Sequence, residues 1–283
     1  MLREVRKWRH ARPLDISSIN GAGPVKIATW NVNGVRAREA QLLEFISREQ
    51  PDILCLQEIK ASVDQLPLWL CEIDGYWCYW HGARGYSGVA LHVRKAACAE
   101  RPAFEHPSFD FESRIVLARL PWFTVASIYV PNGGKDFAAK LQFLQALDEV
   151  AAAHAAEARP LVLCGDMNVA RTEMDVHPRE RKANAIGQRP DERALLEQVI
   201  GRGLVDVHRA LEPDNAELYT WWAPWRNMKA RNIGWRLDLI LASHVLAGHV
   251  VSCMVQREFG TSDHGPVIAE FNLGEVPAPD ELL

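Results

Sequence analysis

Two halves of the 283-residue chain repeat one order of elements, and this repetition restricts the fold more than any other feature. Each half contains an apolar strand, a helix with apolar residues at helical spacing, and a second strand followed by a carboxylate. These elements fall at residues 25–30, 38–50 and 53–56 before Glu58, and at residues 123–130, 136–157 and 161–164 before Asp166. Two sheets packed face to face with helices outside satisfy this order, so the pattern predicts an α/β fold.

Polar clusters lie at the ends of four predicted strands. They occupy residues 30–33, 56–58, 165–168 and 261–266. Asp166 and Asn168 are two residues apart, so in an extended segment both side chains would face the same way. Each cluster alone also fits a simple turn after a strand. Together, their carboxylate and amide oxygens predict one site for a hard divalent cation at the rim of a folded sheet.

Asp238 lies within an otherwise apolar strand, residues 237–241, where a carboxylate is costly unless it is paired. One interpretation pairs it with Arg236 as a structural ion pair. The other pairs it with His264, whose imidazole it would orient and make more basic, so that His264 takes a proton from water. A lone histidine is more often a satisfied core residue, but the neighbouring Asp263 favours the functional interpretation.

Aromatic residues lie near the predicted site in two segments. Tyr129 ends a strand before a glycine turn, where it either donates to a phosphate oxygen or packs in the sheet. Four tryptophans alternate with basic residues between positions 221 and 236: Trp221, Trp222, Trp225 and Trp235 with Arg226, Lys229, Arg231 and Arg236. This mixture suits phosphate contacts and stacking on bases, and equally an aromatic core with a charged rim. The whole inventory predicts metal-assisted phosphodiester hydrolysis.

Composition excludes some classes and leaves others open. The net charge of −4 provides no global positive field for nucleic acid, although a local basic rim suffices. Six cysteines form no CxxC pair, and four lie in apolar runs, which indicates buried thiols in a reducing cytoplasm. No apolar stretch reaches about 18 residues, so we expect no membrane partner. A monomer is the default expectation.

The chain contains no linker after residue 24, so we expect residues 25–283 to form a single catalytic domain. Apolar residues make up 48% of the sequence, enough for a sizeable core. Residues 1–24 form a basic extension with five arginines and lysines in its first half. We interpret it either as a loosely held tail or as an additional arm that contacts DNA.

Seven segments, in order, are similar to motifs of the exonuclease III / abasic-site endonuclease family, within the endonuclease–exonuclease–phosphatase superfamily. They are residues 30–38, 51–58, 88–91, 129–133, 165–169, 232–238 and 262–266. The resemblance covers about residues 25–273. It implies a four-layer α/β sandwich of two mostly antiparallel sheets packed face to face with helices outside. It also implies one or two Mg²⁺ or Mn²⁺ ions and a double-stranded DNA substrate.

The resemblance also assigns roles by position. The matched metal-site positions are Asn31, Glu58, Asp166, Asn168, Asp263 and His264, with Glu58 as the main ligand. The matched catalytic positions are Tyr129, Asp166, Asn168, Asp238 and His264. The matched DNA-contacting positions are Arg36, Asn132, Trp221, Trp225, Trp235 and Leu237. Among these, Trp221, Trp235 and Leu237 fall where relatives build a pocket for an extruded abasic sugar, and Trp225 falls near a residue that relatives insert into the minor groove.

The sequence therefore predicts a DNA phosphodiester hydrolase of base-excision repair. Its activity would be 3′→5′ exodeoxyribonuclease III, AP endonuclease cleavage 5′ to abasic sites in duplex DNA, or both. Asn33 stands where some relatives have Asp, which weakens one ligand of a second ion. One alternative is a superfamily phosphoesterase acting on lipid or inositol phosphates, which the Trp- and Arg-rich segment 219–238 disfavours. Another is a non-catalytic DNA-binding relative.

Overall fold

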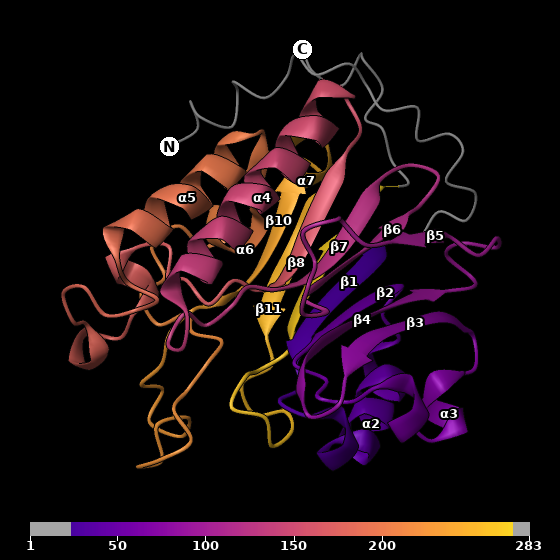
Figure 1. Ribbon diagram of the computed structural model, residues 1–283, viewed down its shortest axis with the longest axis horizontal. Coiled ribbons are helices and arrows are strands. Elements are labelled where there is room, and N and C mark those ends of the chain that lie inside the picture. Colours follow the sequence, from indigo (N-terminus) through magenta and orange to yellow (C-terminus); the bar gives the residue numbers. More distant parts are fainter. Residues whose placement is uncertain (1–23, 274–283) are drawn as a thin grey trace.

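The computed structural model describes residues 24–273 and contains two six-stranded β-sheets (Figure 1). Except for Pro24, the basic extension predicted at residues 1–24 lies outside the described residues.

The first sheet contains β1 (Val25–Asn31), β2 (Ile53–Gln57), β3 (Tyr76–Ala83), β4 (Tyr86–Arg94), β11 (Val250–Val255) and β12 (Val267–Phe271). Their order across the sheet is β11-β12-β1-β2-β4-β3. β1 and β2 run parallel, and every other neighbouring pair in this sheet is antiparallel.

The second sheet contains β5 (Ala103–Glu105), β6 (Ile115–Arg119), β7 (Thr124–Tyr129), β8 (Leu161–Asp166), β9 (Leu204–Asp206) and β10 (Asp238–Ser243). Their order is β5-β6-β7-β8-β10-β9. Here β7 and β8 form the parallel pair, and the other neighbours are antiparallel.

A long helix joins the two strands of each parallel pair, because parallel neighbours need a crossover connection. The helices are α2 (Glu39–Glu49) in the first half and α4 (Phe137–Ala156) in the second. In register, Asn31 pairs with Gln57, and Tyr129 pairs with Asp166. The predicted strand-helix-strand repeat is therefore confirmed, and it places the polar strand ends side by side.

Helices cover the outer face of each sheet (Figure 1). α2 and α3 (Leu68–Cys71) lie on the first sheet, and α4 and α5 (Pro190–Gly201) lie on the second. Short helices α6 (Val207–Leu211) and α7 (His244–Ala247) flank β10, and four single 3-10 turns lie at Val35–Ala37, Val63–Gln65, Glu173–Asp175 and Pro178–Glu180. This arrangement confirms the predicted α/β sandwich of two mostly antiparallel sheets. Between residues 24 and 273, no helix is at once long enough and apolar enough to cross a bilayer.

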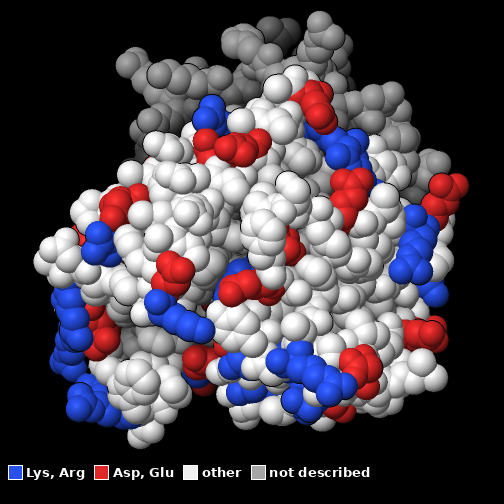
Figure 2. Space-filling model, viewed as in Figure 1, with Lys and Arg blue, Asp and Glu red and all other residues white. Residues whose placement is uncertain are grey.

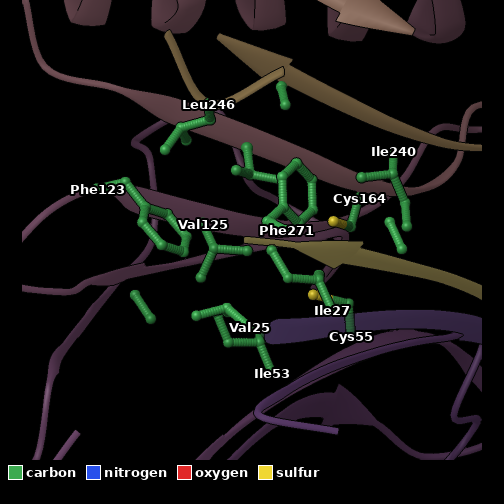
Figure 3. Close-up of a cluster of buried hydrophobic side chains, with 14 of the residues drawn as sticks. Val25, Ile27, Ile53, Cys55, Phe123, Val125, Cys164, Ile240, Leu246 and Phe271 are labelled. Carbon is green, nitrogen blue, oxygen red and sulfur yellow. The ribbon is translucent and has the colours of Figure 1, made fainter. Parts of the chain in front are cut away.

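The inner faces of the two sheets share one apolar core (Figure 3). Ile27 and Cys55 project into it from the first sheet, and Val125, Cys164 and Ile240 project from the second. All five are at most 1% exposed. Because side chains alternate along a strand, the neighbouring residues face the outer helices, so both faces of each central strand are buried.

Gly165 allows the close approach of β7 and β8 just before the polar end of β8. Its φ is +151°, and a Cβ at this position would lie 1.9 Å from the carbonyl oxygen of Ile128. Any side chain here would force the two parallel strands apart. The glycine therefore helps to fix the position of Asp166, the next residue.

Candidate active site

The polar ends of strands from both sheets meet at one edge of the sandwich. β1 ends at Asn31 and β8 ends at Asp166. Asp238 begins β10 and pairs in register with Asp166, because an antiparallel strand starts where its neighbour ends. His264 precedes β12, which starts beside the end of β1. Two separate sheets thus present four polar residues at the same edge.

Asp166 is held by groups from both sheets. The side-chain amide of Asn31 donates to Oδ2 of Asp166 at 2.9 Å, which bridges β1 and β8. The backbone N–H of Asn168 donates to Oδ1 of Asp166 at 2.9 Å, and its side chain donates to the Val130 carbonyl at 2.9 Å. The segment after β8 is therefore the Asx-type turn that the sequence allowed, and both its side chains belong to the polar group.

His264 lies between two buried carboxylates. Its Nδ1 is 2.8 Å from Oδ2 of Asp238, and its Nε2 is 3.8 Å from Oδ2 of Asp166. Burial lowers the pKa of His264, but the carboxylates of Asp238 and Asp166 outweigh it and raise the pKa to about 10. Burial raises the pKa of Asp166 to about 7, although His264 opposes this shift. The two carboxylates therefore favour the protonated form of His264 against the cost of burying it.

Arg236 does not pair with Asp238, which settles the alternative left open by the sequence. Its guanidinium instead donates to Asp175 at 2.7 Å and to both carboxylate oxygens of Asp206, at 2.9 and 2.7 Å. Burial raises the pKa of Asp175, but Arg236 and Arg209 outweigh this and lower it to about 2. Arg236 is 1% exposed, so it belongs to a buried ion-pair network rather than to a surface that contacts DNA.

Glu58 and Asp263 lie on the more open side of the site. Glu58 follows β2 with a left-handed φ of +54°, and its carboxylate is 2.8 Å from Nζ of Lys60. Lys60 also donates to Oδ1 of Asn33 at 2.7 Å, and Nδ2 of Asn33 donates to Asp263 at 2.8 Å. The indole N–H of Trp221 donates to the other oxygen of Asp263 at 3.0 Å. Asn33 thus links the two acidic positions.

The donor set at this edge fits a hard divalent cation. Carboxylate and amide oxygens predominate, which are the ligands that Mg²⁺ and Mn²⁺ prefer. One buried oxygen, Oδ1 of Asp238, has no hydrogen-bond partner among the described residues. The ligand atoms of Asp166, Asp238 and His264 lie within 4.8 Å of one another. Glu58, the predicted main ligand, stands outside this three-residue group and is paired with Lys60.

Tyr129 ends β7 next to Asp166 in register. Burial raises the pKa of its hydroxyl, and the negative charges of Glu58 and Asp166 raise it further. The hydroxyl therefore stays protonated and remains a hydrogen-bond donor. The guanidinium of Arg114 lies 4.9 Å from the centre of the Tyr129 ring and holds it by a cation–π contact.

An aromatic group borders His264. The rings of Trp221 and Trp235 meet edge to face, with centroids 5.7 Å apart, and Trp221 lies 6.4 Å from the His264 ring. Both tryptophans and Leu237 belong to one small apolar cluster. Trp222 is 1% exposed and packs in a separate core cluster, so the aromatic-core interpretation holds for that residue.

The remaining predicted DNA-contacting residues lie on the surface. Trp225 is 58% exposed, and Arg36 is exposed in the turn after β1. Asn132 is exposed after β7, and its side chain donates to Asn168 at 3.3 Å. Lys, Arg, Asp and Glu are interspersed over the face shown in Figure 2, in keeping with the absence of a global positive field.

Sequence reasoning missed several residues that support the site. Thr220 accepts the backbone N–H of Asp238 at 2.9 Å, and Ser262 donates to the Asn31 carbonyl at 2.7 Å. Lys140, in the first turn of α4, is fully buried and donates to the Asn168 carbonyl at 2.7 Å. A lysine in a long helix usually faces solvent, so nothing in the local sequence distinguishes Lys140 from a surface residue.

A sequence model described as Endonuclease/Exonuclease/phosphatase family matches residues 28–264. The chain is 35% identical over 265 residues to DNA repair nuclease APEX1 of Danio rerio, covering 90% of this chain and 85% of that protein. It is 30% identical over 256 residues to Exodeoxyribonuclease of Bacillus subtilis, covering 88% and 100%. The match to Recombination repair protein 1 of Drosophila melanogaster, at 35% identity, covers 88% of this chain but only 37% of that longer protein.

Solved structures show the same likeness. The 3′ phosphatase NExo from Neisseria, bound to a product DNA hairpin, superimposes with a TM-score of 0.78 at 31% identity, covering 87% of this chain and 99% of that one. An AP endonuclease from Archaeoglobus fulgidus gives a TM-score of 0.75 at 31% identity, covering 88% and 99%.

Proposed function

The chain belongs to the Endonuclease/Exonuclease/phosphatase family and is a DNA-repair nuclease, and we propose that it uses a divalent cation to hydrolyse phosphodiester bonds in duplex DNA. The observation that carries this proposal is the meeting of both sheets at one polar edge. There, Asn31 of the first sheet bonds to Asp166 of the second, beside the buried pair of His264 and Asp238.

The proposed substrates are abasic sites and 3′ ends of double-stranded DNA. The apolar group of Trp221, Trp235 and Leu237 beside His264 supports this choice. An apolar cluster next to the reacting group suits contact with a sugar that lacks a base. Extruding a nucleotide costs a few kcal/mol, and the cost is lowest where no base is stacked.

Four residues would hold the cation, Mg²⁺ or Mn²⁺: Glu58 as the main ligand, with Asn31, Asp263 and Asp166. Whether one or two ions bind, the cation would neutralise charge that develops on the phosphate. Lys60 stands 2.8 Å from Glu58 and holds that carboxylate in place. The direct bond from Asn33 to Asp263 reduces the freedom of Asp263 in the same way.

The protein groups around the phosphate have distinct proposed tasks. His264 is oriented through Nδ1 by Asp238, which leaves Nε2 facing Asp166 and the attacking water. In our proposal, His264 or Asp166 accepts the proton that this water loses as it attacks. Asn168 holds a phosphate oxygen, and the protonated hydroxyl of Tyr129 donates to the phosphate or the leaving oxygen.

The proposed working unit is a monomer of one catalytic domain over residues 25–283. The two sheets share one core, which supports a single catalytic domain. The six cysteines are free thiols, four of them buried, which supports a reducing compartment such as the cytoplasm. Light scattering of the protein at working concentration tests the monomer directly.

Digestion of matched duplexes tests the proposed activity. One duplex carries an abasic analogue, a second carries only a recessed 3′ end, and a phospholipid serves as a third substrate. We expect cleavage of DNA with Mg²⁺, none with EDTA, and no release of phosphate from the lipid. Glu58→Gln should slow cleavage at least about 100-fold, whereas Glu44→Gln, an exposed change on α2, should not. Cleavage at the wild-type rate by Glu58→Gln would reject the metal assignment.

A further inference from the structure

A second cluster of metal-ligand side chains joins the outer edges of the two sheets. His81 lies on β3, the edge strand of the first sheet, and His106 directly follows β5, the edge strand of the second. Asp110 lies in the loop between β5 and β6. One ligand atom from each residue lies within 4.8 Å of the others. In register, His81 is two strands away from Gln57, which places it about 10 Å from the end of β2.

The contacts within the cluster are short and well defined. Nε2 of His81 is 2.8 Å from Oδ2 of Asp110, and the rings of His81 and His106 stack with centroids 3.7 Å apart. The side chain of Asp110 is fully buried, and its other oxygen accepts the backbone N–H of Arg114 at 2.7 Å. The hydroxyl oxygen of Tyr79 lies 2.6 Å from Nε2 of His106, so a fourth atom with a lone pair lies beside the cluster.

The surroundings orient these groups as a protein orients metal ligands. Nδ1 of His106 faces the Ile115 carbonyl at 3.3 Å, and a carbonyl that accepts Nδ1–H leaves the lone pair on Nε2. Asp110 is likewise fixed by the backbone of Arg114, and its other oxygen, Oδ2, is held facing Nε2 of His81.

We propose that His81, His106 and Asp110 form a binding site for a zinc-type dication, separate from the cation of the active site. Two imidazole nitrogens and one carboxylate oxygen are a donor set that suits Zn²⁺ and is too rich in nitrogen for Mg²⁺. The ion would tie the edge of one sheet to the edge of the other. It would also fix the loop that carries Arg114, whose guanidinium lies 4.9 Å from the Tyr129 ring.

Zinc titration of the chelator-treated full chain, in saturating Mg²⁺, tests the proposal. Calorimetry should count one more zinc ion in the wild type than in His81→Gln/His106→Gln. The melting temperature should rise with zinc in the wild type by more than in that variant. His249→Gln, which changes a histidine outside the cluster, should behave like the wild type. The proposal does not depend on nuclease activity, because neither readout measures cleavage.

Cobalt absorption provides a second readout, which the wild type gives even if the histidine variant does not fold. Co²⁺ bound by two imidazoles in a site of low coordination number should give visible d–d bands in the wild type, and excess Zn²⁺ should remove them. The conservative variant Asp110→Asn should weaken these bands. Equal zinc counts in the wild type and the histidine variant, or the absence of both zinc uptake and cobalt bands at micromolar protein, would overturn the proposal.

Discussion

Replacing Lys140 by methionine removes the hydrogen bonds that hold two active-site loops in place. Nζ of Lys140 donates to the carbonyls of Asn168, at 2.7 Å, and Asn132, at 3.2 Å. The same amine lies 2.5 Å from Oε2 of Glu192 on α5, and both side chains are fully buried. One buried ion pair therefore connects two helices with the two loops that follow β7 and β8.

The expected loss of stability follows from the partner that is left behind. Removing the amine leaves the Glu192 carboxylate buried without a cation, which costs about 3–5 kcal/mol. We therefore expect Lys140→Met to lower the free energy of unfolding by about 4 kcal/mol. In Lys140→Met/Glu192→Gln no charge is left unpaired, and the Gln oxygen still accepts the N–H groups of Gly187 and Arg189. The double variant should recover about 2 kcal/mol.

Urea unfolding followed by tryptophan fluorescence measures both variants, with the exposed Lys135→Met as the matched control. Cleavage of an abasic duplex, assayed well below the melting temperature, adds a second test. Both Lys140 variants should lose kcat/KM, because both lack the donor to the Asn168 carbonyl. The reasoning is refuted if Lys140→Met costs less than about 1 kcal/mol, or if the double variant is no more stable than the single one.

Three further predictions concern the dyad, the buried ion-pair network and the strand crossing. His264→Asn and His264→Asn/Asp238→Asn should cleave DNA equally slowly because a dyad acts as a unit, and multiplicative losses in kcat would argue against it. Asp175→Asn should destabilise the protein at neutral pH, because the lowered pKa of Asp175 stabilises the fold above pH 3.8. The difference in stability between the wild type and this variant should shrink as pH falls towards 2, and a difference independent of pH would contradict the assignment. Gly165→Ala should cost at least about 2 kcal/mol in thermal unfolding, because its Cβ meets the Ile128 carbonyl at 1.9 Å, and an unchanged melting temperature would show that the strands separate easily.

The sequence predicted the fold and the place of the site because both depend on local patterns. Asn31, Glu58 and Asp166 each follow an apolar strand, and parallel strands bring such ends to one edge. The pairing of Asp238 with His264 needed the structure, since a nearer cation, Arg236, was available in the sequence. That arginine is drawn away by Asp175 and Asp206, which lie 61 and 30 residues distant.

Long-range partners also explain what sequence reasoning missed. Lys140 resembles a surface lysine until α5 brings Glu192 against it. Three tryptophans lie in one segment of the sequence: Trp221, Trp222 and Trp235. The sequence does not show which of these rings enters the core, because this depends on the register of the backbone pairing. β-bridges pair Trp221 with both Trp235 and His264, whereas Trp222 turns into a different cluster. His81 and His106 are 25 residues apart and meet only because the two sheet edges pack together.

The central claim is that strand ends from both sheets surround one cation that engages DNA. Anomalous diffraction from a crystal soaked in Mn²⁺ tests it most directly. The account predicts a peak within bonding distance of a Glu58 carboxylate oxygen, beside Asn31 and Asp263. A well-occupied peak elsewhere, with none at Glu58 in a crystal whose protein still cleaves DNA with Mn²⁺, would contradict it.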